Sequence, residues 1–208
     1  NPIGRDYSEA AERRRIAATI AVLDREQLES GPIVEGRMRP GENRRETFRP
    51  ADCAVAIGTT ADATIDDVAA AIAAARRAQP GWDAAGGAAR AAVLRAMGDA
   101  LEAKFDRFVA TISREAGRTL DDGVAEVREA IDFCRYYATL AEGQFVPLLL
   151  PGPVGETNRL ELRGRGIFAC ISPWNFSLSI FTGQIAAALA AGNAVLAKPA
   201  EQTPIVAA

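Results

Sequence analysis

Residues 166–198 read GIFACISPWNFSLSIFTGQIAAALAAGNAVLAK, and no Asp, Glu, Lys or Arg lies between Arg165 and Lys198. A neutral stretch of this length is long enough to span a bilayer. However, Pro173, Asn175 and the pair Gly192-Asn193 divide it into an apolar run of strand length, an alanine-rich run of helix length and a second short apolar run. We interpret the stretch as a strand, a crossover helix and a second strand in a buried core, and we expect no membrane span.

The two apolar runs predict neighbouring strands of a parallel sheet. Residues 166–171 and 194–197 are continuously apolar, which is typical of strands covered by helices on both faces. Ligands of such sheets bind at the carboxyl ends of the strands. Polar residues follow both runs, SPWNF at 172–176 and KPAE at 198–201. We therefore expect these two polar segments to meet at one edge of the sheet.

The composition excludes several classes of function. The chain has 208 residues, a formal charge of -3 and no histidine. The negative charge argues against a nucleic-acid partner. The lack of histidine excludes Ser-His and Cys-His catalysis and His-ligated metals, and we predict no metal site. Three cysteines and the absence of a recognisable signal peptide favour a reducing, cytoplasmic location.

Hydrophobic periodicity predicts four helices before residue 144. Their expected ranges are 6–31, 64–79, 88–115 and 121–141. A capping box is expected at the start of the first helix, formed by Asp6 and Glu9, and at the start of the second, formed by Thr64 and Asp67. The second helix is expected to end before Pro80. In the third, residues 93, 97, 101 and 105 form the expected apolar stripe. In the fourth, residues 124, 127, 131 and 134 are apolar at helical spacing and form the expected apolar face.

Three other segments are predicted to form short strands. Residues 47–48 (TF) and 55–57 (VAI) have the composition of short strands within a region rich in turn residues. Charged and apolar side chains alternate over 159–163, as in a half-exposed strand. The segment 147–163 is therefore a candidate hairpin.

The polar segment at 172–176 has two interpretations. The Asn175 amide can donate to an oxygen that becomes negative during a reaction, without adding a titratable group. It could equally close a turn after Pro173. Trp174 and Phe176 could form the walls of a ligand site or simply pack in the core.

Lys198 and Glu201 also have two interpretations. A neighbouring ammonium and carboxylate can bind vicinal hydroxyls such as those of a ribose, one donating and the other accepting. An exposed ion pair of this kind is also common on protein surfaces, where it contributes about 0 to 1 kcal/mol. The position beyond a buried strand favours the ligand interpretation.

Three blocks, ISPWNF at 171–176, ALAAGN at 188–193 and KPAEQTP at 198–204, together resemble the aldehyde dehydrogenase superfamily. Further matches at 114–117, 125–130, Cys170 and 181–184 resemble the L-glutamate γ-semialdehyde dehydrogenase (pyrroline-5-carboxylate dehydrogenase) domain of bacterial proline utilization A proteins. This resemblance runs along the whole chain.

The resemblance implies an NAD-dependent oxidation of an aldehyde, most specifically of L-glutamate γ-semialdehyde to L-glutamate. It implies that Asn175 stabilises the oxyanion and that Phe176 faces the aldehyde. Lys198 and Glu201 would bind the adenosine ribose of NAD. The residues implied to line the cofactor cleft are Ile171, Ser172, Pro173 and Trp174. FAD is expected only if a proline dehydrogenase domain precedes this segment.

The resemblance also implies an α/β fold that is a fragment of a larger one. The expected regions are an N-terminal helix and β-hairpin region at 1–63, a helical part of a Rossmann-like NAD-binding domain at 64–143, an oligomerisation hairpin at 144–165, and the first β-α-β unit of the dinucleotide-binding core at 166–208. The expected partners are the aldehyde, the remainder of the same chain and further copies of the protein. Another semialdehyde dehydrogenase of the superfamily and a non-catalytic helical interaction module remain the alternatives.

The nucleophilic cysteine and the general-base glutamate of the superfamily have no counterpart in this sequence, so the segment alone is expected to be inactive. We interpret Cys53, Cys134 and Cys170 as structural. Cys170 lies in an expected buried strand and Cys134 on an apolar helix face, where a dry environment raises the pKa of a thiol, and Cys53 lies in a polar region. Ser177 stands where the superfamily very often has proline. We expect it to cap the following helix, with no consequence for function.

Overall fold

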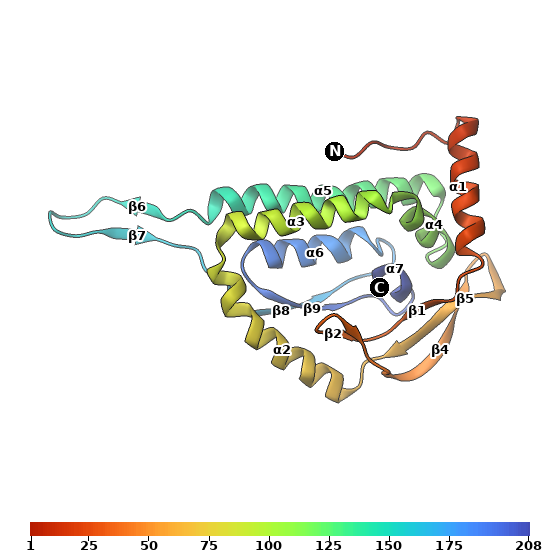
Figure 1. Cartoon of the computed structure of the whole chain (residues 1–208), viewed down its shortest axis with the longest axis horizontal. Helices are drawn as coiled ribbons and strands as arrows, with labels where there is room; N and C mark the ends of the chain where they lie inside the picture. Colours follow the sequence, from red (N-terminus) through yellow and green to blue (C-terminus); the bar gives the residue numbers. More distant parts are fainter.

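The computed structural model describes residues 1–208 and confirms the strand, helix and strand of the uncharged stretch (Figure 1). Strand β8 (Ile167–Ile171) and strand β9 (Ala194–Lys198) are parallel, and helix α6 (Ser179–Ala190) connects them. Gly192 ends the crossover with φ +85°, a left-handed conformation that glycine adopts without strain. The unit is a parallel β-α-β unit within a mixed α/β fold.

Asn193 fixes the register of this unit. Its Oδ1 accepts from the backbone N–H of Gly166 over 3.0 Å, and its Nδ2 donates to the carbonyl of Ala188 over 3.1 Å. One buried side chain thus connects the start of β8, the end of α6 and the start of β9. Buried amides are stable only with such partners.

Helices cover the two strands from both sides. Helix α2 (Ile65–Ala84) contacts β8 and β9 on one side, and α6 contacts them on the other. Helices α3 (Gly86–Ala103) and α5 (Leu120–Gln144) lie side by side beyond α6 (Figure 1). The prediction of fully buried strands is wrong, however, because Phe168 is 43% and Ile171 66% exposed. Only two strands form this sheet, so the helices do not enclose every side chain.

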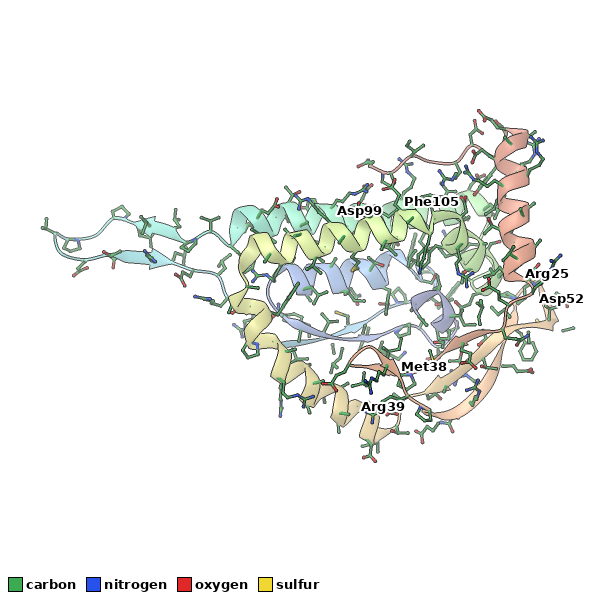
Figure 2. The ribbon with its side chains drawn as sticks, viewed as in Figure 1. Arg25, Met38, Arg39, Asp52, Asp99 and Phe105 are labelled. Atoms are coloured by element: carbon green, nitrogen blue, oxygen red, sulfur yellow. The ribbon has the colours of Figure 1, made fainter.

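The main hydrophobic core lies where α4 (Phe105–Glu115) packs against α5 on one side and α1 (Ala10–Leu23) packs against α4 on the other. Its buried side chains include Ile16, Leu23, Phe105, Val109, Ile112, Val127 and Ile131. Phe105 lies at the turn between α3 and α4, where the chain changes direction (Figure 2). The predicted apolar face of α5 is confirmed, because Val124, Val127, Ile131 and Cys134 are all buried.

A second sheet has the order β1–β5–β4. Strand β1 (Leu28–Ser30) is parallel to β5 (Asp52–Asp62), and β4 (Glu42–Arg49) is antiparallel to β5. The strands expected at 47–48 and 55–57 are confirmed, although both are longer than predicted. A small hairpin of β2 (Ile33–Val34) and β3 (Arg37–Met38) precedes them, and helix α7 (Pro204–Ala207) contacts β1.

The segment after α5 forms the predicted hairpin. Strand β6 (Leu148–Leu150) pairs with β7 (Asn158–Leu160) in antiparallel orientation. The hairpin projects far from the rest of the chain (Figure 1). The three leucines of β6 are exposed.

Three helix predictions need correction. The first helix is Ala10–Leu23, because Asp6 accepts from the N–H of Ser8 and no side chain caps the helix start. Helix α2 continues through Pro80, because the side chains of Gln79 and Trp82 donate to the carbonyls of Gly192 and Leu189 over 3.0 and 2.9 Å and hold its last turn. The capping box of Thr64 and Asp67 is confirmed.

The third predicted helix is divided at Lys104 into α3 and α4. Its expected stripe is only partly confirmed. Phe105 is buried and Leu101 packs against the core, but Val93 is 51% exposed and the neighbouring Leu94 is buried instead. Small residues such as Gly87 and Gly98 face α5 and bring the two helices close together. No helix in the chain is both long enough and apolar enough to cross a membrane.

Candidate cofactor and aldehyde site

The carboxyl ends of β8 and β9 lie next to each other. Ile171 pairs with Lys198 in the parallel register, and the N–H of Ser172 donates to the carbonyl of Lys198 over 3.1 Å. The polar segments at 171–176 and 198–201 therefore leave the sheet side by side, as predicted. We call these two segments the rim.

Lys198 and Glu201 form one part of the rim. The Lys198 Nζ lies 4.0 Å from the Glu201 carboxylate, and the two side chains are 59% and 72% exposed. The ammonium also donates to the carbonyl of Pro199 over 3.1 Å. Both groups keep free hydrogen-bonding capacity, so a diol could bind to the donor and the acceptor together.

Asn175 and Phe176 lie in the turn between β8 and α6. Arg118 holds this turn from the side, because its Nη1 donates to the carbonyl of Asn175 over 2.6 Å. The same guanidinium lies 5.1 Å from the centre of the Phe176 ring, in a cation–π contact. The Asn175 side chain is exposed and can donate to a ligand.

The remaining predicted rim residues differ in exposure. Ile171, Pro173 and Trp174 are exposed and can contact a bound molecule. Ser172 is buried, and its hydroxyl has no hydrogen-bond partner in the chain. Gln184 of α6 donates to the carbonyl of Ile171 over 3.2 Å and fixes the end of β8.

A buried carboxylate from α5 holds the far side of the same turn. Glu126 Oε1 accepts from the N–H of Leu178 over 2.6 Å and from the hydroxyl of Ser177 over 3.2 Å. Burial raises the pKa of the Glu126 carboxyl, and these two donors together with Arg118 lower it by less. Ser177 therefore does not cap α6 as predicted, because its hydroxyl is directed to Glu126.

A second buried carboxylate holds the segment after β9. The two oxygens of Glu115 in α4 accept from the N–H groups of Ile205 and Val206, each over 2.7 Å. Burial raises the pKa of Glu115 to about 7, although these two N–H groups act in the opposite direction. Buried glutamates thus hold the backbone beyond both segments of the rim, at residues 177–178 after the first and in the first turn of α7 after the second.

The three cysteines lie outside the rim. Cys134 and Cys170 are buried, and burial raises the pKa of the Cys134 thiol to about 11 and raises that of Cys170 as well. Cys53 is exposed on β5. A nucleophile needs a stabilised thiolate, and the buried pair has the opposite environment.

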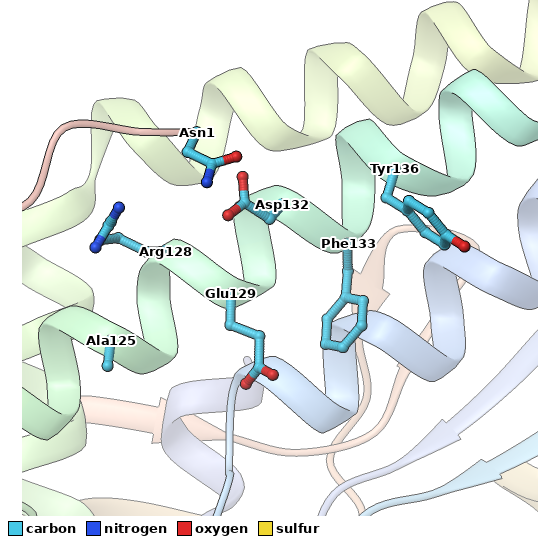
Figure 3. A pocket seen from close by; sticks show the side chains of 7 residues that line it. All are labelled: Asn1, Ala125, Arg128, Glu129, Asp132, Phe133 and Tyr136. Carbon is cyan, nitrogen blue, oxygen red and sulfur yellow. The ribbon is translucent and has the colours of Figure 1, made fainter.

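A hollow of about 590 Å³ lies along α5 (Figure 3). It is lined by Asn1, Ala125, Arg128, Glu129, Asp132, Phe133 and Tyr136. None of these residues belongs to the rim, so different side chains form the two features.

Sequence reasoning assigned no role to Arg118, Glu115 or Glu126. The two glutamates lie in the segments that carry the family resemblance, and Glu126 directly precedes the buried Val127 on α5. A carboxylate inside an apolar helix face is a signal that a buried donor is nearby. The backbone N–H groups that donate to these two carboxylates lie about 50 to 90 positions away in the sequence, so a local pattern does not identify them.

The order of elements and the rim define a class of protein. The profile of the aldehyde dehydrogenase family matches residues 38–208, and the chain belongs to this family.

Individual relatives show which members of the aldehyde dehydrogenase family the chain is similar to. The chain is 40% identical to the bifunctional protein PutA of Escherichia coli K12 over 99% of its own length, and 33% identical to a 1-pyrroline-5-carboxylate dehydrogenase of Geobacillus thermodenitrificans over 97%. It spans 15% of the first relative and 39% of the second. The chain is therefore similar to one part of each.

Solved structures agree with this comparison. Proline utilization A of Bdellovibrio bacteriovorus, inactivated by N-propargylglycine, superposes with a TM-score of 0.94 at 29% identity, over 100% of this chain and 22% of that one. A 1-pyrroline-5-carboxylate dehydrogenase from Thermus with bound NAD superposes with a TM-score of 0.92 at 28% identity, over 99% of this chain and 41% of that one. The described fold is thus part of a larger aldehyde dehydrogenase fold.

Proposed function

We propose that this chain is the N-terminal part of an NAD-dependent aldehyde dehydrogenase that oxidises L-glutamate γ-semialdehyde to L-glutamate in proline catabolism. The observation that supports it most directly is the pairing of Ile171 with Lys198, which sends both polar segments out of the sheet side by side. The similarity to PutA and to 1-pyrroline-5-carboxylate dehydrogenases supports the choice of substrate.

Lys198 and Glu201 are proposed to hold the adenosine ribose of NAD. The ammonium donates to one ribose hydroxyl, and the carboxylate accepts from the other. Ile171, Ser172, Pro173 and Trp174 line the same cofactor cleft, and the unpaired buried hydroxyl of Ser172 fits a polar ligand. When bound, NAD supplies a hydride acceptor.

Asn175 is proposed to stabilise the negative charge that develops on the aldehyde oxygen. Its neutral amide donates a hydrogen bond without adding a titratable group to the site. Phe176 provides an apolar contact to the aldehyde. The nucleophile and the general base are proposed to come from another part of the protein. This segment by itself is therefore expected not to catalyse the reaction.

The β6–β7 hairpin is proposed to contact another copy of the protein. Leu148, Leu149 and Leu150 are consecutive and exposed, which is unfavourable for a projection that remains in water. A homo-oligomer that buries these side chains removes this exposure.

Substitutions in the full-length protein test the proposal. Lys198→Ala and Glu201→Ala should each raise the Kd for NAD by about tenfold, because a lost ribose contact is worth about 1.4 kcal/mol. Isothermal titration calorimetry measures this Kd, and Glu156→Ala in the exposed hairpin loop is the matched control. Unchanged NAD binding in both rim variants would contradict the proposed cofactor site.

A substrate panel tests the choice of aldehyde. We expect the highest kcat/KM for L-glutamate γ-semialdehyde among semialdehydes that are shorter or longer by one methylene, or that lack the amino group. A higher value for one of the others would identify a different semialdehyde dehydrogenase with the same cofactor site.

A further inference from the structure

The turn that carries Asn175 is held at both ends by side chains from outside the rim. At its C-terminal end, Glu126 accepts from the N–H of Leu178 over 2.6 Å and from the hydroxyl of Ser177 over 3.2 Å. These two residues directly follow Phe176. Glu126 is 2% exposed, so α5 supplies a rigid acceptor that water does not replace.

At the N-terminal end, Arg118 donates to the carbonyl of Asn175 over 2.6 Å. Arg118 lies just before α5, and its guanidinium also lies over the ring of Phe176 and 3.7 Å from Asp122. The cation therefore contacts the backbone of one site residue and the ring of the next.

The direction of the Asn175 side chain depends on these contacts. The Asn175 side chain is exposed, so no packing around it fixes its position. Its Cα position and backbone orientation are set by the hydrogen bonds of the turn. An oxyanion donor must lie about 2.7 to 3.1 Å from the charged oxygen, so a small rotation of the turn removes its effect.

We propose that Glu126 and Arg118 are positioning residues that hold the turn at 175–178 so that the Asn175 amide faces the aldehyde oxygen. This inference rests on the proposed role of Asn175. Neither residue needs to touch the substrate, because each acts through the backbone of the turn. Ser177 is a further component, since its hydroxyl gives Glu126 a second donor.

A purely structural role for Glu126 makes a different prediction. Loss of a merely structural carboxylate lowers the amount of folded protein and leaves kcat per folded molecule unchanged. A positioning role lowers kcat in the folded protein while the Kd for NAD stays nearly the same. Lys198 and Glu201 leave the sheet from the other strand, and the backbone at Ile171 and Ser172 is held by Gln184 and Lys198 and not by Glu126.

The experiment uses the full-length protein with Glu126→Ala, Glu126→Gln and the control Asp121→Asn, an exposed carboxylate on the same helix. Glu126→Ala should lower kcat by about tenfold or more, since displacement of a catalytic group by about 1 Å costs up to about a hundredfold. Glu126→Gln should restore most of kcat, because the amide oxygen still accepts from Leu178. The NAD affinity should change by less than about twofold in all three variants.

Hydrogen exchange supplies a readout that is independent of activity. The peptide that contains Leu178 should exchange faster in Glu126→Ala than in Glu126→Gln or in the wild type, because its N–H has lost the acceptor. If Glu126→Ala does not fold, Ser177→Ala and Arg118→Lys test the positioning role through kcat, because the N–H of Leu178 keeps Glu126 as its acceptor in both. Unchanged exchange and unchanged kcat in Glu126→Ala, or unchanged kcat in both milder variants, would overturn the inference.

A double-mutant cycle separates this inference from the proposed function. If Glu126 acts through Asn175, Glu126→Ala should lower kcat by less than about twofold in an Asn175→Ala background. Additive losses would overturn the positioning role and leave Asn175 as the oxyanion donor. Full activity of Asn175→Ala alone would instead overturn the proposed role of Asn175, and the positioning role with it.

Discussion

The N–H of Ser172 donates to the carbonyl of Lys198 over 3.1 Å, one residue beyond the last pair of β8 and β9. This bond extends the parallel ladder past the end of β8, to the point where the first polar segment begins. The segment with Asn175 and the segment with Glu201 therefore begin from a common, rigid base.

Replacement of Glu201 should change the choice between NAD and NADP. A carboxylate at the ribose repels a 2′-phosphate, and Glu201→Gln removes that repulsion while keeping an acceptor. We expect the ratio of Kd for NADP to Kd for NAD to fall by about tenfold. Calorimetric titration with both cofactors measures it, and an unchanged ratio would place Glu201 away from the 2′ position.

Glu115 should make the stability of the protein depend on pH. The pKa of Glu115 is about 7 in the folded protein, compared with an ordinary value of 4.5. Between pH 4.5 and about pH 7, the folded state therefore keeps a proton that the unfolded state has released. The free energy of unfolding should therefore fall as the pH rises through this window, by about 3 kcal/mol from this group. Urea unfolding at about pH 5 and about pH 8 measures the fall, which Glu115→Gln should largely remove. An identical pH dependence in both proteins would argue against the titration of Glu115.

Arg90 lies outside the rim but should be important for the stability of the protein. Its guanidinium is buried and donates to the carbonyls of Ala190 at the end of α6 and Asp83 at the end of α2, over 3.0 and 2.8 Å. Arg90→Met leaves these carbonyls without a partner and should cost about 2 to 4 kcal/mol. Arg95→Met on the same helix breaks only an exposed ion pair and should cost less than about 1 kcal/mol in the same unfolding experiment.

Charge in the hairpin should disrupt self-association. Leu149→Asp places a carboxylate on the exposed apolar strand β6, where its burial in an interface is unfavourable. Sedimentation velocity should show a smaller species than the wild type, with NAD affinity retained. Val22→Asp is a control, because it adds the same charge to an exposed apolar position on α1. If both variants keep the wild-type assembly, the hairpin is not the contact.

The cysteines should differ in their reaction with iodoacetamide. Cys53 is exposed, whereas burial and a raised pKa protect Cys134 and Cys170. Peptide mass mapping should show labelling of Cys53 in the folded protein and of the other two only after unfolding. Rapid labelling of Cys170 in the folded state would contradict its structural assignment.

Local patterns were sufficient to predict the central unit of the fold. The uncharged stretch predicts β8, α6 and β9 because apolar runs and Gly192 mark the ends of each element. The adjacency of the two rim segments then follows from the rules of parallel sheets. The capping box of Thr64 and Asp67 and the buried face of α5 were predicted for similar local reasons.

Contacts between distant segments could not be predicted in this way. Pro80 is tolerated because side chains of α2 bond to carbonyls more than 100 residues later. The buried face of α3 was missed because it is formed by small residues, and a side chain at Gly87 would meet the carbonyl of Ala141 at 2.1 Å. Glu115 and Glu126 look like ordinary helical glutamates until their backbone donors are known.

The sheet of β8 and β9 has only two strands, so each strand has a long side with no hydrogen-bonded neighbour. Such a side is a template for any extended chain, including a second copy of the same segment. Any strand that pairs with either side would occupy this template. Pairing of these two edges and protection from aggregation are therefore one and the same event for this part of the protein.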